Sequence, residues 1–387
     1  MSKPQKKKVI IIGGGIAGLM CASILKDAGF KNFLVITKDV GGRILSSQNK
    51  IVNYGAYFVT KRYKTLWPFL DITRRMPKRT FGFVKNGWVH SLFEISSIKS
   101  FFRIIGVFWA IFWFERRFNR FRRACLSTSQ KEALLSDPYL LKLYEHNGSV
   151  VVHDLHAYKL VRAYFDQLGN FMSFAYLGHA NGFSLLQWAS EMLLHRMYEF
   201  ELNVERLIHG YKKKIIPGEV MDIKIPTKEG FPYVIVTDNG TYEADYVVLA
   251  TEPWTTRKLL GLHSKKQNVI GSYVRHIAGT PKGIAVTRKR YLMFPSRGGM
   301  ISIGKQSDGT YLVYTDSKDV DISPYFETFE IIYEREWTPA FIFSSHRLLE
   351  AHHHDRLWIA GGSNFEGMED CAITGKYAAN QILSSID

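Results

Sequence analysis

A glycine-rich turn near the start of the chain constrains the fold more than any other feature. The apolar, β-favouring residues 9–12 run directly into Gly13-Gly14-Gly15-Ile16-Ala17-Gly18, and an apolar, alanine-bearing segment follows to Gly29. This order predicts a buried strand, a tight turn and a helix. Gly13 would permit the turn, Gly15 would let backbone N–H groups approach a pyrophosphate, and Gly18 would let the helix pack close to the strand. The stretch therefore predicts a dinucleotide site.

The next strand indicates which dinucleotide this is. Residues 33–36 are apolar and form the expected second parallel strand, whose end normally carries an acid for the adenosine ribose. Thr37 occupies that position and can offer a hydroxyl, with Asp39 two residues on. A second glycine turn, Gly41-Gly42-Arg43, follows at once, and its arginine can neutralise phosphate charge. Two phosphate-handling turns that flank one strand favour FAD over NAD.

Together with these turns, three further segments resemble the flavin-containing amine oxidase superfamily. They are residues 53–56, where such proteins place a D-x-G-A-like turn, residues 247–251, and residues 357–379. The superfamily includes protoporphyrinogen oxidases and carotenoid desaturases and, more distantly, UDP-galactopyranose mutases. The chain departs from its pattern where Thr37 and Gly362 replace two expected acids, and where the second glycine turn arrives early after the strand.

The resemblance implies an α/β fold in which an FAD-binding Rossmann-like domain of the glutathione reductase type is interleaved with an α+β substrate domain. The FAD-binding domain would comprise residues 1–75, 211–260 and 346–387. The substrate domain would comprise residues 76–210, with a hairpin and helices, and residues 261–345, with a sheet. The residues expected at the cofactor are Gly13, Gly15, Ile16, Ala17, Gly18, Thr37, Gly41, Gly42, Arg43, Gly55, Ala56, Val220, Ala250, Thr251, Gly361, Gly362, Met368 and Glu369.

The resemblance also implies the chemistry. A flavin protein of this kind would oxidise an apolar or amphipathic small molecule by hydride transfer to flavin N5, with no catalytic side chain identifiable from position alone. The segments 54–58 and 63–67 resemble UDP-galactopyranose mutases, which keeps a non-redox UDP-sugar mutase open as an alternative. A flavin-binding protein that has lost catalysis is the third interpretation, because two acids are replaced. Cys371, inside the last helix-start motif, is interpreted as a packing residue.

The charge of the chain points to anionic partners. The formal net charge is +16, and the basic residues cluster at 6–8, 74–79, 116–123 and 212–214. An anionic membrane or a phosphorylated substrate fits this balance, whereas nucleic acid is not expected, because no zinc finger, RNP-like strand or helix-turn-helix pattern accompanies the charge. The three cysteines are far apart and the histidine spacings suit no metal, so no metal site is expected. These features, with an N-terminus unlike a signal peptide, predict a cytoplasmic protein.

The stretch 101–123 is the most unusual part of the sequence. Its uninterrupted apolar core, residues 104–114, is much shorter than the roughly 20 residues that a spanning helix needs. One interpretation is an interfacial helix in which Trp109 and Trp113 enter the lipid boundary while arginines, Arg122 among them, meet anionic headgroups. The other, which we favour, is a buried helix of the substrate domain whose basic end is solvated. The protein would in the first case be peripheral to a membrane.

The remaining segments are assigned by periodicity and turn signals. Residues 80–90 predict a hairpin, 128–136, 154–168 and 183–199 predict helices, and the segments from 283 to 315 predict a largely antiparallel sheet. The side chains proposed for the substrate wall are Arg275, Arg297, Tyr311, Tyr314 and Trp337.

Overall fold

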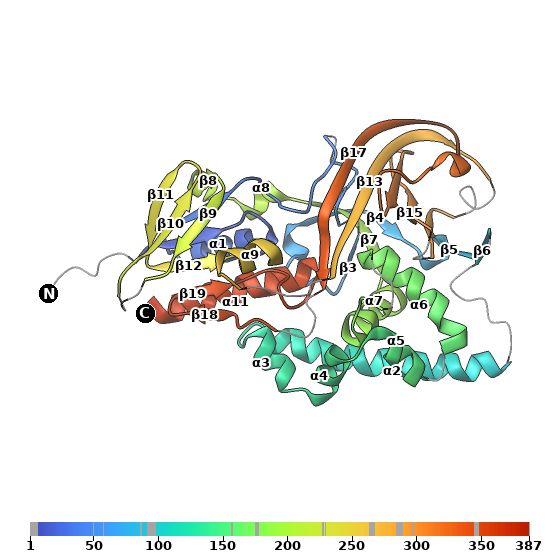
Figure 1. The fold of residues 1–387 in the computed structure, drawn as a ribbon, viewed down its shortest axis with the longest axis horizontal. Helices are drawn as coiled ribbons and strands as arrows, with labels where there is room; N and C mark the ends of the chain where they lie inside the picture. The colour runs from blue at the N-terminus through green and yellow to red at the C-terminus, as the bar shows by residue number, and fades with distance from the viewer. Residues whose placement is uncertain are drawn as a thin grey trace.

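The computed structural model describes residues 7–48, 50–56, 58–85, 87–90, 98–155, 158–174, 178–226, 228, 230–262, 268–283, 289–295, 298–343 and 348–386. Two sheets with their helices make up most of the chain, and a helical layer lies beneath them (Figure 1).

The first sheet forms around β1 (Val9–Ile12), whose four residues are all buried. β1 pairs in parallel with β2 (Phe33–Thr37) on one side and with β12 (Tyr246–Leu249) on the other. A strand buried on both sides and both faces favours a continuous apolar run, which is the pattern at residues 9–12. The sheet has six strands in the order β18-β19-β12-β1-β2-β8, and its other members are β8 (Ile215–Pro217), β18 (His352–His354) and β19 (Leu357–Ile359).

Small residues bring two helices together on this sheet. α1 (Ile16–Asp27) follows β1 directly, and α11 (Met368–Ile386) packs along it. A Cβ atom built on Gly375 would lie 2.1 Å from the carbonyl oxygen of Ala17, so glycine is required for this approach. Segments more than 340 residues apart in the chain therefore share one core. Next to this sheet lies a three-stranded one formed by β9 (Val220–Lys224), β10 (Tyr233–Thr237) and β11 (Gly240–Ala244), together with α9 (Pro253–Leu259).

The second large sheet has seven strands in the order β17-β13-β16-β15-β14-β5-β6. Adjacent strands in this sheet pair antiparallel, except that β14 and β5 pair in parallel. The two long strands β13 and β17 run together in a curved ribbon over the top of the sheet (Figure 1). The strands are β5 (Phe81–Lys85), β6 (Trp88–His90), β13 (Asn268–Pro281), β14 (Tyr291–Met293), β15 (Met300–Lys305), β16 (Tyr311–Thr315) and β17 (Phe326–Phe343).

The helical layer comes from the middle of the chain. An aromatic core joins its helices to the second sheet, with Phe118 and Phe183 both fully buried. The helices are α2 (Ile98–Ala124), α3 (Gln130–Leu135), α4 (Pro138–Glu145), α5 (Gly148–Asp154), α6 (Tyr158–Ser173) and α7 (Gly182–Leu194). Shorter helical segments lie elsewhere, at α8 (Val204–Leu207), η1 (Trp67–Phe69), η2 (Lys78–Thr80), η3 (Lys212–Lys214) and η4 (Ser323–Tyr325).

Two predictions about this region are wrong in detail. The helix expected over 154–168 is divided between α5 and α6. The helix expected over 183–199 ends at Leu194, and β7 (Met197–Leu202) follows as a strand. β7 pairs with β3 (Val59–Thr60) and β4 (Leu70–Met76), so cross-strand pairing decides the conformation of a segment whose local sequence suits either structure.

The two large sheets are built from separate segments of the chain. All strands of the six-stranded sheet come from residues 9–12, 33–37, 215–249 and 352–359, and all strands of the seven-stranded sheet come from 81–90 and 268–343. The predicted boundary at residue 75 falls inside β4, because β4 belongs to the small sheet that β7 completes. The strand expected at 283–286 lies largely outside the described residues, whereas those at 291–315 are present.

The segment 101–123 lies within α2, and its interior face is buried against the helical layer. Both interpretations of the basic end place Arg122 at the surface, and for this residue both are wrong. Arg122 is buried in an ion pair with Asp370. Within the described ranges, no helix combines the length and the hydropathy that crossing a bilayer would require.

Candidate functional site

A cavity of about 620 Å³ lies where the parallel sheet, the helical layer and β17 meet. One side is formed by the turns that follow β1 and β2 and by the start of α11. The opposite side is formed by side chains from α6, α7 and β17. Every residue expected at the cofactor lines this cavity except Gly18 and Glu369.

The turn after β1 brings backbone to the cavity wall. Gly13 has φ +113°, and a Cβ atom there would lie 2.4 Å from the carbonyl oxygen of Ala250. Gly15 is different, because a Cβ atom built on it would meet nothing within 4 Å. It is the N-cap of α1, with no side-chain hydrogen bond to the first turn and no acidic residue in that turn. The amides at this end of α1 therefore have no intrahelical acceptor, and they carry the positive end of the helix dipole at the wall of the cavity.

Gly18 stands behind the cavity wall and has a packing role. A Cβ atom at Gly18 would lie 1.9 Å from the carbonyl oxygen of Gly13, so only glycine allows α1 to leave the turn at this angle. Its expected place at the cofactor is corrected accordingly: Gly18 shapes the turn without reaching the cavity.

The second glycine turn closes against the first. The N–H of Gly41 donates to the carbonyl oxygen of Gly14 at 2.8 Å, and Gly42 has φ +61°. Arg43 lines the cavity and donates from Nη1 to the carbonyl oxygen of Ala340 in β17, at 2.8 Å. Arg43 thus links the wall formed by the parallel sheet to the wall formed by the second sheet.

The end of β2 carries a hydroxyl that is already engaged. Thr37 Oγ1 donates to the carbonyl oxygen of Asp39 at 2.7 Å. Asp39 and Glu219 also line the cavity, and Glu219 pairs with Lys38 at 2.7 Å. Two carboxylates therefore accompany Thr37 at this end of the cavity, and Glu219 was not anticipated from the sequence.

The N-terminus of α11 faces the other end of the cavity. Gly361, Gly362, Met368 and Cys371 line it here. Burial raises the pKa of the Cys371 thiol to about 12, so this side chain stays protonated at neutral pH. Cys371 was expected to serve packing alone, and the structure places it at the cavity wall as well.

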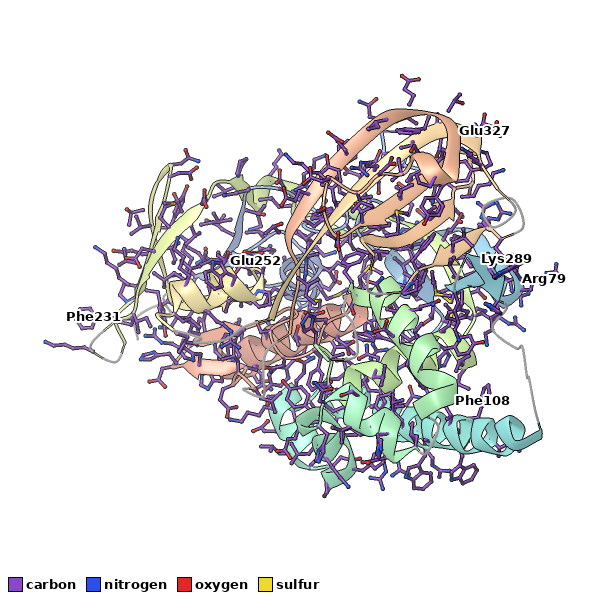
Figure 2. The ribbon with its side chains drawn as sticks, turned by 45° about the vertical axis from the view of Figure 1, so that its right-hand side comes forward. Arg79, Phe108, Phe231, Glu252, Lys289 and Glu327 are labelled. Atoms are coloured by element: carbon purple, nitrogen blue, oxygen red, sulfur yellow. The ribbon has the colours of Figure 1, made fainter. Side chains whose placement is uncertain are left out.

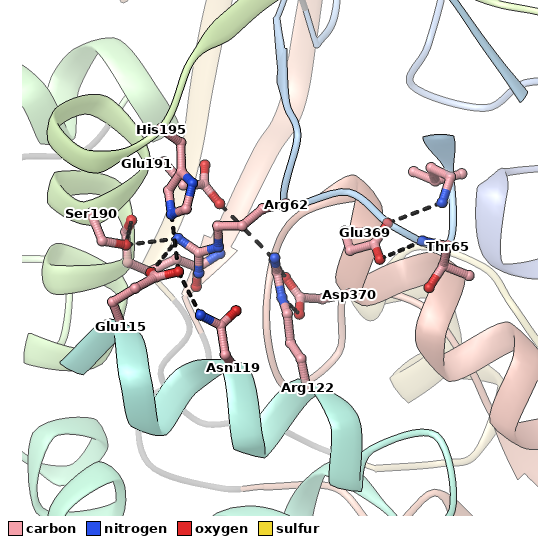
Figure 3. Close-up of polar contacts among 12 residues, drawn as sticks. Arg62, Thr65, Glu115, Asn119, Arg122, Ser190, Glu191, His195, Glu369 and Asp370 are labelled. Atoms are coloured by element: carbon pink, nitrogen blue, oxygen red, sulfur yellow. Dashed lines mark hydrogen bonds and ion pairs between the residues drawn. The ribbon is translucent and has the colours of Figure 1, made fainter. Parts of the chain in front are cut away.

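The two acids in the first turn of α11 are bound to protein groups. Glu369 accepts hydrogen bonds from the backbone N–H groups of Thr65 (2.7 Å) and Leu66 (3.1 Å), and Asp370 receives two from Arg122, at 2.9 and 2.6 Å. The Glu369 carboxylate is thus engaged in holding α11 to the segment 63–66 (Figure 3), and the expected place of Glu369 at the cofactor stays a prediction that rests on the backbone N–H groups of this turn.

The opposite wall is mainly aromatic. Its members from the helical layer and neighbouring segments are Tyr54, Phe58, Phe171, Phe174 and Trp188, and Trp337 is added from β17. Of the side chains expected in a substrate wall, only Trp337 is there. Arg275 donates to the carbonyl oxygens of Val320 and Lys318, Tyr314 donates to that of Tyr54, Tyr311 packs in the interior of the second sheet, and Arg297 lies outside the described residues.

A buried network of charges joins Arg62 to side chains of α2 and α7 (Figure 3). Arg62 donates to Ser190 Oγ at 2.7 Å and pairs with Glu115 at 3.1 Å, and Glu115 also contacts His195 at 2.9 Å. Burial raises the pKa of Glu115, but the hydrogen bond from His195 and the charge of Arg62 outweigh it, so the pKa falls to about 2. Glu115 is therefore ionised at neutral pH.

Glu191 is the member of this network that lines the cavity. Its side chain is 3% exposed, and its Oε1 lies 4.0 Å from Arg122 Nη2, with no hydrogen bond among the described residues. Burial raises its pKa, and the charges of Arg62 and Arg122 oppose that shift. A buried carboxylate with an unused acceptor at the wall is a group that can bind a donor from a ligand. Among the described residues, no three His, Cys, Asp or Glu side chains are grouped to hold a metal ion.

Comparisons with known proteins agree with this architecture. A family model for NAD(P)-binding Rossmann-like domains matches residues 11–73. Putrescine oxidase in complex with putrescine is similar over 98% of this chain and 99% of its own, with 13% identity and a TM-score of 0.67. Cyclohexylamine oxidase from Brevibacterium oxydans (13% identity, TM-score 0.65) covers 98% of both chains.

A third solved structure extends the similarity. A putative protoporphyrinogen oxidase from Exiguobacterium matches with 13% identity and a TM-score of 0.65 over 98% of this chain and 99% of its own. No curated protein matches the chain in sequence. The predicted α/β Rossmann-like fold with an interleaved second domain is confirmed, and the chain shares the fold of these solved oxidases.

Proposed function

We propose that the protein is an FAD-dependent oxidoreductase that acts on an apolar or amphipathic small molecule. The observation that carries the proposal is one cavity that joins the N-termini of α1 and α11 and continues to an aromatic wall. A helix N-terminus favours an anion, and two of them at one cavity suit a cofactor that has both a pyrophosphate and a ring that gains negative charge.

The residues present fit FAD. The open space at Gly15 and the uncapped first turn of α1 form a cradle for the pyrophosphate. Asp39 and Glu219 stand beside Thr37, so they supply carboxylates for the adenosine ribose from two neighbouring segments. Gly361, Gly362 and the first turn of α11 would hold the ring system, and the backbone N–H groups of that turn would stabilise negative charge on it. FAD, when bound, supplies the hydride acceptor.

The chain's own residues would bind and orient the substrate. The aromatic side chains of the opposite wall offer apolar surface and exclude water from the reacting region. Gln187 and Glu191 are neighbouring polar groups from α7 that line the same cavity, so they would fix the orientation of an amphipathic substrate by its polar end.

The test begins with a visible absorbance spectrum of the purified protein before and after dithionite, followed by detection of FAD in the supernatant of a heat-denatured sample. A substrate that bleaches the flavin without oxygen, and oxygen or another acceptor that restores the colour, would support an oxidoreductase. A flavin protein that binds UDP and turns over UDP-sugar only after reduction would contradict the proposal in favour of a mutase. A protein that neither contains nor takes up FAD would contradict it entirely.

A matched pair of variants tests the cofactor position. Gly15→Val is expected to leave the fold intact, because the added Cβ meets no protein atom within 4 Å. It should weaken the affinity for FAD by about 100-fold, which corresponds to about 3 kcal/mol of binding free energy. Gly106→Val in α2 is the control, because Gly106 also has no neighbour within 4 Å of an added Cβ and lies outside the cavity wall. Equal FAD content in both variants would rule out the cradle at Gly15.

A further inference from the structure

The outward face of α2 carries a row of exposed apolar side chains. Ile105, Trp109, Phe112 and Trp113 are 49%, 66%, 50% and 41% exposed. They recur at helical spacings of three and four residues, which places them on one face. Large apolar side chains gathered in one exposed patch, unlike single ones, mark an interaction surface.

The opposite face of α2 fixes this orientation. Ile111, Phe114 and Phe118 are fully buried, and Phe114 and Phe118 pack edge-on against Phe183 of α7. The helix cannot rotate to bury the exposed row without withdrawing these rings from the core. Exposure of Trp109 and Trp113 is therefore set by the packing of the rest of the helix.

Three arginines continue the same face toward the C-terminal end of α2. Arg116, Arg120 and Arg123 are exposed and follow Phe112 and Trp113 at helical spacings. Within the described part of the chain, no carboxylate forms an ion pair with Arg116 or Arg120. We define the docking stripe as Ile105, Trp109, Phe112, Trp113, Arg116, Arg120 and Arg123.

We propose that the docking stripe binds the surface of a lipid bilayer that contains anionic headgroups. The four apolar side chains would enter the boundary between headgroups and acyl chains, and the arginines would contact the phosphates. A second copy of the chain is a poorer occupant, because it brings a net charge of +16 and the same arginines to the contact. The described helices include none that could span a membrane, so α2 would lie along the surface.

The position of α2 permits this contact. The helix lies along one edge of the molecule, away from the parallel sheet (Figure 1), and side chains project outward from it around Phe108 (Figure 2). Phe231 marks the opposite end of the view and lies far from the docking stripe (Figure 2). The exposure of the stripe side chains shows that the described residues leave this face of α2 uncovered.

The experiment is flotation of the full-length protein with vesicles of phosphatidylcholine, with and without phosphatidylglycerol. The parent protein should float with the anionic vesicles and much less with the neutral ones. Trp109→Ser combined with Trp113→Ser should lower the partition constant for vesicle binding by about tenfold or more, because two large apolar side chains leave the interface. Trp254→Ser is the matched control, since Trp254 is 52% exposed but lies on α9.

A second pair of variants tests the charge. Arg116→Glu combined with Arg120→Glu should weaken vesicle binding by at least about fivefold for each arginine lost. Arg74→Glu combined with Arg75→Glu makes the same charge change on β4, where both side chains are exposed, and should have a much smaller effect. Circular dichroism and the melting temperature of every variant show whether the fold is intact.

Several outcomes would overturn the proposal. These are absence of flotation by the parent protein, equal binding to neutral and anionic vesicles, and equal losses in the stripe variants and their controls. A parent dimer that the tryptophan variant converts to a monomer, without any vesicle binding, would assign the docking stripe to a second copy instead.

Discussion

The N-termini of α1 and α11 reach the same cavity with opposite chemistry. The first turn of α1 has no acidic residue and no side-chain cap, and space is left open at Gly15. The first turn of α11 has two acids, Glu369 and Asp370, and both carboxylates are bound to protein groups. One helix end is left available to a ligand, and the other is anchored by the protein.

This difference assigns separate tasks to the two ends. α1 can offer its amides to an anion because its first turn has neither a side-chain cap nor an acidic residue. α11 needs a fixed position, because it belongs to the parallel sheet's core and also forms the wall nearest the aromatic side chains. The Arg122–Asp370 pair, 248 residues apart in sequence, joins α11 to α2 of the helical layer.

The largest effect on stability is expected when the anchor of α11 is cut. Asp370→Ala would leave Arg122 buried without its hydrogen-bonded partner, with only the Glu191 carboxylate 4.0 Å away, which costs about 3–5 kcal/mol. Urea unfolding of the variant measures this loss. Glu350→Ala removes the exposed Lys131–Glu350 pair and should cost at most about 1 kcal/mol. Similar losses in both variants would show that α11 is not anchored in this way.

The turn that opens α1 should be almost as sensitive. Gly18→Ala would place Cβ on the carbonyl oxygen of Gly13, so α1 must shift at a cost of about 3 kcal/mol. The variant should lose both stability and FAD, in contrast to Gly15→Val, which should lose FAD alone. Thermal unfolding and FAD content, measured together, separate the two glycines. A Gly18→Ala protein that melts like the parent would contradict the tight packing.

The charges behind the anchor should make stability depend on pH. Glu115 has its pKa lowered to about 2 in the folded protein from an ordinary 4.5, so its contribution to stability is present above about pH 4.5 and disappears as the pH falls toward 2. The contribution is at most about 3 kcal/mol. Glu115→Gln should be less stable than the parent at neutral pH, and the difference should shrink on acidification. A difference that is independent of pH would refute this assignment.

The smallest effect is expected at Glu369, the other acid in the first turn of α11. Glu369→Ala would leave the backbone N–H groups of Thr65 and Leu66 without an acceptor, at a cost of about 2 kcal/mol. Glu369→Gln keeps one acceptor oxygen and should recover part of that loss. Both variants should retain FAD if Glu369 does not contact the cofactor. A selective loss of FAD with unchanged unfolding would instead place the Glu369 side chain at the cofactor.

Most of the residues that the sequence predicts at a cofactor line one cavity, because their signals are local. The strands around β1, the glycine turns and the start of α11 are each specified by a few consecutive residues, and they line the cavity together. Gly18 and Glu369 do not line it, since the same motifs contain residues that face the cavity and residues that pack against the protein. Only the packing of the surrounding chain distinguishes them.

The aromatic wall and the charge network could not be predicted in the same way. Arg62 meets Ser190 across 128 positions, and Arg122 meets Asp370 across 248, so no local pattern links the partners. Glu191 looks like an ordinary polar residue of α7 until the cavity is known. β7 was misassigned for a related reason, because its conformation follows from pairing with β3 and β4.

The order of segments along the chain has a consequence for synthesis. β19 and α11 lie at the end of the described chain, yet they complete the sheet that β1 begins and provide the wall at Cys371. While a ribosome is still making residues 350–386, α1 lacks its neighbour and Arg122 lacks Asp370. Until residues 368–386 have been made, the emerging chain therefore leaves an apolar face of α1 uncovered and Arg122 without its hydrogen-bonded carboxylate, so the cavity wall at Cys371 forms only after α11 has been synthesised.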